Sequence, residues 1–393
     1  MDNEIKDFIE VPTLKTRRWR AVSILLILVG GVAFWIGVSG AHAQRTWQAY
    51  LINFVFWSGL SFGSVLFVAV LNLTSARWGR PFKRLAESLG SCSIPFFALF
   101  WALYFGCDKI FPWIEEPLSG KQMWLNIPFL FARDGAALFL LTAVSMVLIY
   151  FSIRGDERAW RYQTILSPVF GILYCFVLTL VSFDLIMSLD PHWANTLFGG
   201  YYFVGSFYTA LCGIVILAAL AHKKLGLGRI IHPRHFHDLG KLLFGFCMMT
   251  GYLFYTQFLV IWYGNLPEET RYVILRVRQS PWEPVAWIVF AICFGLPFIL
   301  LLGRKIKMNP GPLTILSLII LIGMWLERFL LVAPSLWEKP EIPLGAIEVL
   351  VTAGFLGVAG LTVTFFLTRF PLLPLSDPLF QEEMKAMAAE VRE

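Results

Sequence analysis

Ten stretches of this chain are long and apolar enough to cross a lipid bilayer. One of them contains the run PVFGILYCFVLTL at residues 168–180, which has no charged side chain. A helix rises about 1.5 Å per residue, so about 20 apolar residues cross the hydrocarbon core. The sequence predicts spans near residues 21–40, 50–73, 86–107, 136–153, 165–187, 201–221, 241–263, 285–303, 313–333 and 345–368.

Spans of this kind leave little choice of secondary structure. Backbone N–H and C=O groups meet no water in the bilayer core, so each run satisfies them by forming a helix. Composition agrees, because 58% of the 393 residues are hydrophobic and 15% are charged, against about a quarter charged in soluble domains. We expect an all-α integral membrane protein with a segment at 1–20, a ten-helix domain at 21–368 and a tail at 369–393.

The Lys and Arg residues indicate how the chain is oriented, because they accumulate in cytoplasmic loops. Between the predicted spans, the N-terminal segment and every second segment after it hold 23 of these residues, and the other segments hold 8. Both termini are therefore expected in the cytoplasm. The net charge of +6 reflects this asymmetry and does not indicate nucleic-acid binding.

A faint internal repeat predicts how the helices group. NFVFWSGLSFGSVLF in helix 2 resembles YYFVGSFYTALCGIV in helix 6, and a basic loop with a proline follows soon after each. The two segments lie four helices apart, and an even number gives parallel repeats related by an axis along the membrane normal. We expect two four-helix bundles, helices 2–5 and 6–9, flanked by helices 1 and 10.

Ionisable residues stand where helix 5 is expected to leave the membrane, in SFDLIMSLDPHW at residues 182–193. Charged groups at membrane depth are costly and commonly mark proton or ion pathways. Asp184 would lie about a turn inside the outer boundary, and Asp190, His192 and Trp193 at headgroup depth. A carboxylate there can accept a proton that a histidine passes outward. Alternatively, Asp190 opens an Asp-Pro turn and His192 is simply interfacial.

Two further places hold acids at membrane depth. Helix 9 carries Glu327 and Arg328 midway, in GMWLERFLLVAP. Adjacent helical residues point about 100° apart, so we expect each to find its partner on another helix. The pair is either structural or part of a proton path. Asp134, after Arg133, is expected to begin helix 4, where a carboxylate favours the positive end of the helix dipole; a place in the proton path is its alternative.

The remaining polar motifs give no cofactor site. The six cysteines stand singly, with no C-x-x-C, so iron–sulfur, zinc and c-haem sites have no support. No histidine is expected in mid-membrane, where a cytochrome b needs facing imidazoles. The histidines of HPRHFH fit a basic interfacial loop better than a metal site. The acidic loop WYGNLPEETRY is either simply solvated or caps a short surface helix. No metal, bound cofactor or catalytic residue is assigned.

Several motifs together carry a family resemblance. SFDLIMSLDPHWANTLFGGYYFVGSF, WYGNLPEET and MWLERF follow one another in a ten-helix chain, with NFVFWSGLSFGSVLF and LTSARWGRPFKRLAE before them. Over about residues 47–334 the chain resembles the polysulfide-reductase (NrfD-like) membrane subunits. Within that family it is similar to the F-type subunits of alternative complex III, a bacterial quinol:electron-acceptor oxidoreductase.

The resemblance implies a place in a respiratory complex of the bacterial inner membrane. It implies a homologous NrfD-like membrane subunit, a periplasmic iron–sulfur protein and c-type cytochromes as partners, with haem c and iron–sulfur held there. Menaquinol or ubiquinol would be oxidised near the outer face, and protons would pass through the membrane subunits.

Individual residues carry over by position. Asp184 matches within SFD, His192 and Trp193 match a similar turn, and Glu327 and Arg328 match a W-x-E-R pattern. The Asp190–Pro191 pair is F-type. One position departs, because Leu178 stands where the C-type sister subunit is expected to have a histidine.

The sequence leaves three functions open. In the first, the chain contributes a scaffold, a quinone site and a proton path to a quinol-oxidising complex. Alternatively, it is a purely structural anchor for the redox subunits. The third function is that of a secondary transporter. Only the prolines Pro95 and Pro297 favour it.

Overall fold

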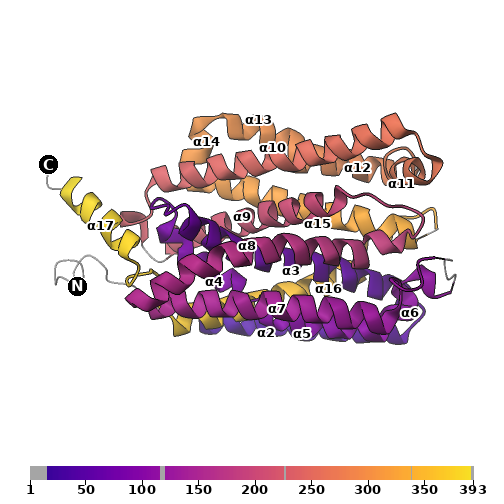
Figure 1. Ribbon diagram of the computed structural model, residues 1–393, viewed down its shortest axis with the longest axis horizontal. Helices are drawn as coiled ribbons and strands as arrows, with labels where there is room; N and C mark the ends of the chain where they lie inside the picture. The colour runs from indigo at the N-terminus through magenta and orange to yellow at the C-terminus, as the bar shows by residue number, and fades with distance from the viewer. Residues whose placement is uncertain (1–15, 116–119, 225–226, 338, 391–393) are drawn as a thin grey trace.

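The computed structural model describes residues 16–115, 120–224, 227–337 and 339–390, and over these residues the chain is helical without strands. Most of the expected N-terminal segment and the last residues of the tail lie outside that part. Ten helical spans are long and apolar enough to cross a membrane. They run along one common axis (Figure 1). The all-α, ten-span membrane fold is therefore confirmed.

Most of the ten spans begin and end close to their predicted positions. The third span is built from η1 (Arg80–Phe82), α4 (Lys83–Gly90), α5 (Ser93–Phe100), η2 (Trp101–Gly106) and α6 (Cys107–Ile110), and the eighth from α12 (Trp282–Phe290), η6 (Ala291–Gly295) and α13 (Leu296–Leu302). The others are α2 (Arg17–Ser39), α3 (Ala43–Leu73), α7 (Ile127–Arg154), α8 (Glu157–Leu185), α9 (Phe198–Lys224), α10 (Pro233–Gly264), α15 (Pro310–Leu336) and α16 (Ala346–Arg369). Short elements connect them: η3 (Pro112–Ile114), η4 (Met187–Leu189), η5 (Leu227–Arg229), α11 (Pro267–Val277), α14 (Arg304–Met308) and α17 (Pro378–Glu390).

Three helices begin well before their predicted starts near 136, 165 and 241. Asn126 caps α7 by accepting a hydrogen bond from the Phe129 backbone N–H at 3.4 Å. Asp156 caps α8 in the same way through the N–H of Ala159 at 2.8 Å. These polar caps satisfy first-turn donors, so the helices extend past the apolar runs that hydropathy detects.

Prolines interrupt two spans. Pro95 and Pro297 provide no backbone N–H, and each stands in a span that is not one regular α-helix. In the eighth span the residues Ala291–Gly295 form a π-helical turn just before Pro297. π turns occur frequently at functional sites, and this one lies against the cavity described below.

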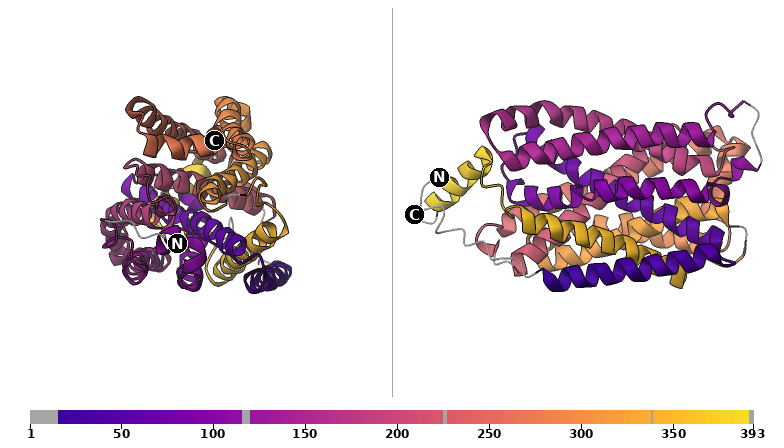
Figure 2. Two further views of the ribbon diagram at one scale, coloured as in Figure 1. Left: turned by 90° about the vertical axis from the view of Figure 1, so that its right-hand side faces the viewer. Right: turned by 90° about the horizontal axis from the view of Figure 1, so that it is seen from below.

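The helices group as two bundles. The first contains α3, the third span, α7 and α8, and the second contains α9, α10, the eighth span and α15. Helices α3 and α9 pack closely and join the bundles, while α2 and α16 form a pair at the side (Figure 2). This grouping agrees with the predicted arrangement.

Small residues allow α3 and α9 to approach closely. A Cβ atom at Gly63 would stand 2.8 Å from the Ala210 Cβ and from the Ser206 carbonyl oxygen. A Cβ at Gly59 would stand 2.6 Å from the Ser206 hydroxyl. In lipid, helices associate through packing of this kind, because hydrophobic burial between them gains little. The G-x-x-x-G spacing of α3 therefore fixes the junction of the two bundles.

The molecule has two distinct ends. Helix α2 begins, and α17 lies, at the end we call the terminal end (Figure 1). Helices α6 and α11 lie at the opposite end, which we call the α11 end. The start of α2 and the helix α17 thus lie at the same end of the molecule, and the cytoplasmic orientation of that end stays a prediction.

Candidate functional site

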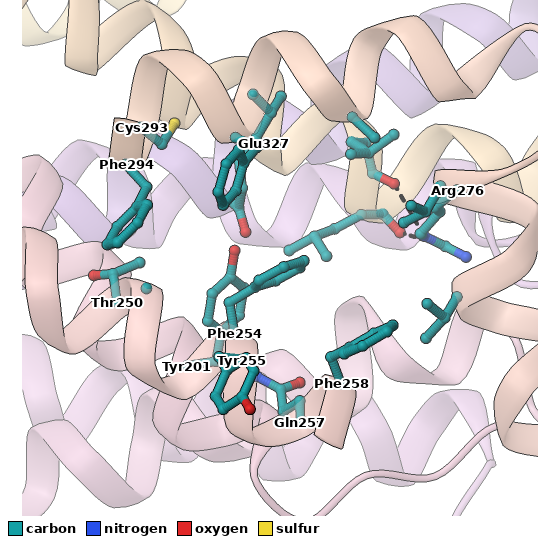
Figure 3. Close-up of a pocket in the computed structure, with 18 of the residues that line it drawn as sticks. Tyr201, Thr250, Phe254, Tyr255, Gln257, Phe258, Arg276, Cys293, Phe294 and Glu327 are labelled. Atoms are coloured by element: carbon teal, nitrogen blue, oxygen red, sulfur yellow. Dashed lines mark hydrogen bonds between the residues drawn. The ribbon is translucent and has the colours of Figure 1, made fainter. Parts of the chain in front are cut away.

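A cavity of about 540 Å³ lies inside the second bundle, toward the α11 end (Figure 3). Side chains of α9, α10, α11, the eighth span and α15 line it, together with Trp193 from the α8–α9 connection. Most of its wall is aromatic or aliphatic, and the lining includes Phe254, Phe258, Phe290, Phe294, Ile261 and Leu331. Its size falls within the range of about 300–1,000 Å³ that is usual for small-molecule sites.

A glycine of α10 and the π-helical turn of the eighth span shape one wall of this cavity. Helix α10 packs against the π-helical turn and α13, whereas α12 packs mainly against α15 and α11. A Cβ at Gly251 would come within 2.4 Å of the Phe294 ring, so the glycine lets this ring lie across α10. The π-helical turn that carries Phe294 and Cys293 therefore forms one wall of the cavity.

Glu327 is the carboxyl group of the cavity wall. Its side chain is almost fully buried, and the Tyr201 hydroxyl interacts with it from α9. Figure 3 shows the two side chains pointing toward each other. One of the two carboxyl oxygens, Oε2, accepts no hydrogen bond in the described structure. Oε2 has the Arg328 guanidinium as its ion-pair partner, at 3.1 Å, and its remaining acceptor capacity is unoccupied by described donors.

Arg328 corrects one prediction. Its Nη1 lies 3.1 Å from Glu327 Oε2, so the adjacent residues do form an ion pair. The long arginine side chain bends back toward its neighbour, which the 100° separation of the two Cα–Cβ directions does not prevent. Arg328 also has the expected partners on another helix: its Nη2 donates to the Tyr202 carbonyl at 3.3 Å and to the Ser206 hydroxyl at 3.4 Å.

Arg276 lies at the α11 end of the cavity and is 4% exposed. Its Nε donates to the Leu330 carbonyl at 3.0 Å, and its Nη2 donates to the Leu331 carbonyl at 2.9 Å and to the Ser335 hydroxyl at 2.7 Å. Pro334, four residues after Leu330, has no N–H to donate to that carbonyl. Arg276 supplies the missing donor and places a positive charge at the C-terminal end of α15, where the helix dipole favours it.

An aromatic stack continues from Arg276. The Tyr272 and Trp193 rings lie parallel, with centroids 3.6 Å apart. The Arg276 guanidinium carbon lies 3.3 Å from the Tyr272 centroid and so occupies the other face of that ring. The Tyr272 hydroxyl and the Trp193 indole N–H are buried and have no hydrogen-bond partner among the described residues. Burial raises the pKa of Tyr272 to about 12, although the Arg276 charge opposes this shift.

Asp184 belongs to a second buried cluster, in the first bundle. It is fully buried in the last turn of α8, and its Oδ2 accepts from Arg133 Nε at 3.0 Å and Nη2 at 2.5 Å. The Trp124 indole N–H donates to Oδ1 at 2.8 Å. Asp184 does not line the cavity of the second bundle, and its surroundings are those of a packed ion pair.

Asp134 lies beside this pair rather than at a helix start. Helix α7 begins at Ile127 and is capped by Asn126, so the capping role predicted for Asp134 is wrong. The Asp134 carboxyl interacts directly with that of Asp184, and neither of its oxygens accepts a hydrogen bond from a described donor. Two carboxyl groups therefore lie beside the single guanidinium of Arg133.

The other residues predicted to lie near Asp184 do not form one site with it. Asp190 is half-buried and His192 is exposed, as an interfacial turn would have them. Trp193 is 3% exposed and lines the cavity of the second bundle, so it packs inside the protein, and its depth in a membrane stays a prediction. The WYGNLPEETRY loop does form a surface helix, α11, but its Tyr272 is buried.

Sequence reasoning missed a third cluster, at the terminal end. Asp377, which precedes α17, accepts hydrogen bonds through Oδ2 from Arg80 Nη1 at 3.0 Å and Lys83 Nζ at 2.8 Å. Burial alone would raise the pKa of Asp377, but the charges of Lys83 and Arg80 outweigh it and lower the pKa. The tail is therefore attached to the third span by a buried ion-pair network.

Among the described residues, no three His, Cys, Asp or Glu side chains are arranged to hold a metal ion. The comparison with models of known protein families finds no match, and no curated protein is significantly similar to this chain.

Proposed function

We propose that the chain is a membrane subunit of a bacterial quinol:electron-acceptor oxidoreductase, in which it provides a scaffold, a quinone-binding cavity and a path for protons. The cavity of the second bundle is the observation that carries this proposal. It combines an apolar, aromatic wall with a few polar groups at separate points, namely Glu327 and Tyr201 on one side and Tyr272 and Trp193 at the α11 end.

A quinone matches this distribution of groups. Its ring is flat and apolar, it bears an oxygen at each of two opposite positions, and its tail is soluble in lipid. The α10 residues around the cavity are also exposed on the outside of the protein, with Tyr255 58% and Phe258 43% exposed. In a bilayer these side chains face lipid, so a ligand with an isoprenoid tail has a direct approach from the membrane.

The acidic clusters support proton transfer in the same proposal. Glu327 borders the cavity, and Asp184 and Asp134 share a buried position beside Arg133. Carboxyl groups at membrane depth commonly serve as proton relays. In this proposal protons leave a bound menaquinol or ubiquinol through such groups, while electrons pass to an iron–sulfur protein and c-type cytochromes held beside a homologous membrane subunit.

A secondary transporter is the second candidate, and the π-helical turn of the eighth span favours it. Transporters often bind substrate where a membrane helix is interrupted at mid-depth. A transporter would act as a single chain, whereas the oxidoreductase subunit requires redox partners. A structural anchor would have no use for the cavity.

Purification of the affinity-tagged chain from its native membranes tests the proposal. We expect c-type haem absorbance, iron–sulfur signals in electron paramagnetic resonance and extractable quinone to follow the tag in stoichiometric amounts. A chain that purifies alone, free of haem, iron–sulfur and quinone, contradicts the proposal, and transport of a solute by that lone chain in vesicles would favour the transporter.

A further inference from the structure

We infer that the second-bundle cavity selects the reduced, hydroxyl-bearing form of its ring ligand over the oxidised, carbonyl-bearing form, and that Glu327 makes this selection. The inference rests on the proposed quinone-binding function. Its basis is the unequal hydrogen-bonding capacity of the two polar parts of the cavity.

The Glu327 side of the cavity accepts hydrogen bonds. A carboxylate has about four acceptor sites and no donor. Arg328 Nη1 donates to Oε1 at 3.4 Å and lies 3.1 Å from Oε2 as its ion-pair partner, and the Tyr201 hydroxyl occupies another site. Oε2 accepts no hydrogen bond from a described donor, so acceptor capacity remains on this carboxyl group. With the guanidinium of Arg328 in contact as counter-charge, the carboxylate form is compensated. A ligand oxygen placed here completes a hydrogen bond only if it brings its own proton.

The α11 end of the cavity donates hydrogen bonds. The Trp193 indole N–H can only donate, and the Tyr272 hydroxyl can donate or accept. Both are buried and unpartnered among the described residues. Since burial raises the pKa of Tyr272 to about 12, its hydroxyl keeps its proton throughout the physiological range. An oxygen of either redox form accepts from these donors, so this end does not distinguish quinol from quinone.

The selection therefore depends on the Glu327 side. A quinol hydroxyl donates to the acceptor capacity that Arg328 and Tyr201 leave on Glu327. A quinone carbonyl there places one acceptor against another and leaves both unsatisfied in an apolar cavity. An unsatisfied buried polar group weakens binding by about tenfold or more. We expect the quinol to bind at least about tenfold more tightly than the matching quinone.

Binding of a short-chain benzoquinone and of its quinol, measured anaerobically on the chain in lipid nanodiscs, tests the inference. Quenching of tryptophan fluorescence gives the two dissociation constants. The wild type should prefer the quinol by about tenfold or more. Glu327→Gln presents an amide that can donate to a carbonyl, so the preference should fall to about twofold or less, mainly through tighter quinone binding. Exposed Glu341→Gln is the matched control and should keep the wild-type preference.

The outcomes separate the inference from the function on which it rests. Equal affinity of the wild type for both forms overturns the selection by Glu327 and leaves the quinone site in place. Absence of binding of either form overturns the proposed quinone function itself. The wild-type ratio decides the inference even if Glu327→Gln fails to fold.

Discussion

Arg276 donates a hydrogen bond from Nε to the Leu330 carbonyl, at 3.0 Å, and Pro334 is the reason that this carbonyl is free to accept it. Replacing Arg276 by Met should therefore lower the free energy of unfolding in detergent, by about 1–3 kcal/mol, because buried carbonyls lose their donor.

The same replacement should cost less in a Pro334→Ala background, where the introduced alanine provides a backbone N–H to the Leu330 carbonyl. A double-mutant cycle of thermal or denaturant unfolding measures this coupling. Strictly additive effects of the two replacements would show that Arg276 does not compensate for the proline.

The close packing of α3 against α9 predicts that the effect of a Gly→Ala replacement on stability depends strongly on its position. Gly63→Ala forces a methyl group to within 2.8 Å of Ala210 and Ser206, so it should destabilise the protein by about 1–3 kcal/mol. Gly245→Ala, in the interior of α10, meets nothing within 4 Å and should be neutral or slightly stabilising. Unfolding of both variants in detergent provides the comparison. If the two alanines cost the same, close packing does not determine the junction.

The attachment of the tail should depend on pH. The charges of Lys83 and Arg80 lower the pKa of Asp377 in the folded protein, so its contribution to stability is present above the unfolded value of about 3.9 and is lost as pH falls through the folded pKa. The difference in Tm between wild type and Asp377→Asn should be constant from about pH 7 to 5 and narrow below about pH 4. Asp108→Asn, at an exposed position, should show no comparable change. A difference that widened in acid would contradict the assignment.

Two aspartates allow a proton relay to be separated from a structural ion pair. Asp184→Asn leaves the Arg133 charge without its ion-pair partner and should lower both Tm and quinol oxidation by the proposed complex. Asp134→Asn keeps the Arg133–Asp184 ion pair and removes the second carboxyl group beside it. It should leave Tm within about 1 °C of wild type, since no described donor is lost, and should slow proton release. Unchanged proton release in Asp134→Asn would assign the cluster a structural role alone.

The sequence was sufficient for the architecture because hydropathy reports membrane spans directly. Helices such as α9 and α15 begin and end within a few residues of the prediction. It failed at the start of α7, where the polar cap Asn126 extends the helix beyond the apolar run and moves Asp134 from a helix end into the interior.

The candidate site was less predictable, because it depends on contacts between distant segments. Glu327 stood out as an acid in an apolar run, but its partner Tyr201 belongs to another helix. Trp193 was recognised only as part of the turn after Asp184, and the structure places it in the cavity of the other bundle. Pro334 indicates in the sequence that a carbonyl of α15 lacks its helical donor, but nothing in the sequence links that carbonyl to Arg276 on α11.

The central claim is that the cavity of the second bundle holds a quinone, and blocking that space tests it most directly. Ala286 lines the cavity, whereas Ala291 lies on the exposed surface of the same span outside the cavity lining. The measurement is the amount of quinone that remains bound per chain after purification from native membranes, for Ala286→Trp and Ala291→Trp, with Tm recorded for each. The account predicts that Ala286→Trp loses most of its quinone while Ala291→Trp retains the wild-type amount. Equal quinone content in the two folded variants would contradict it.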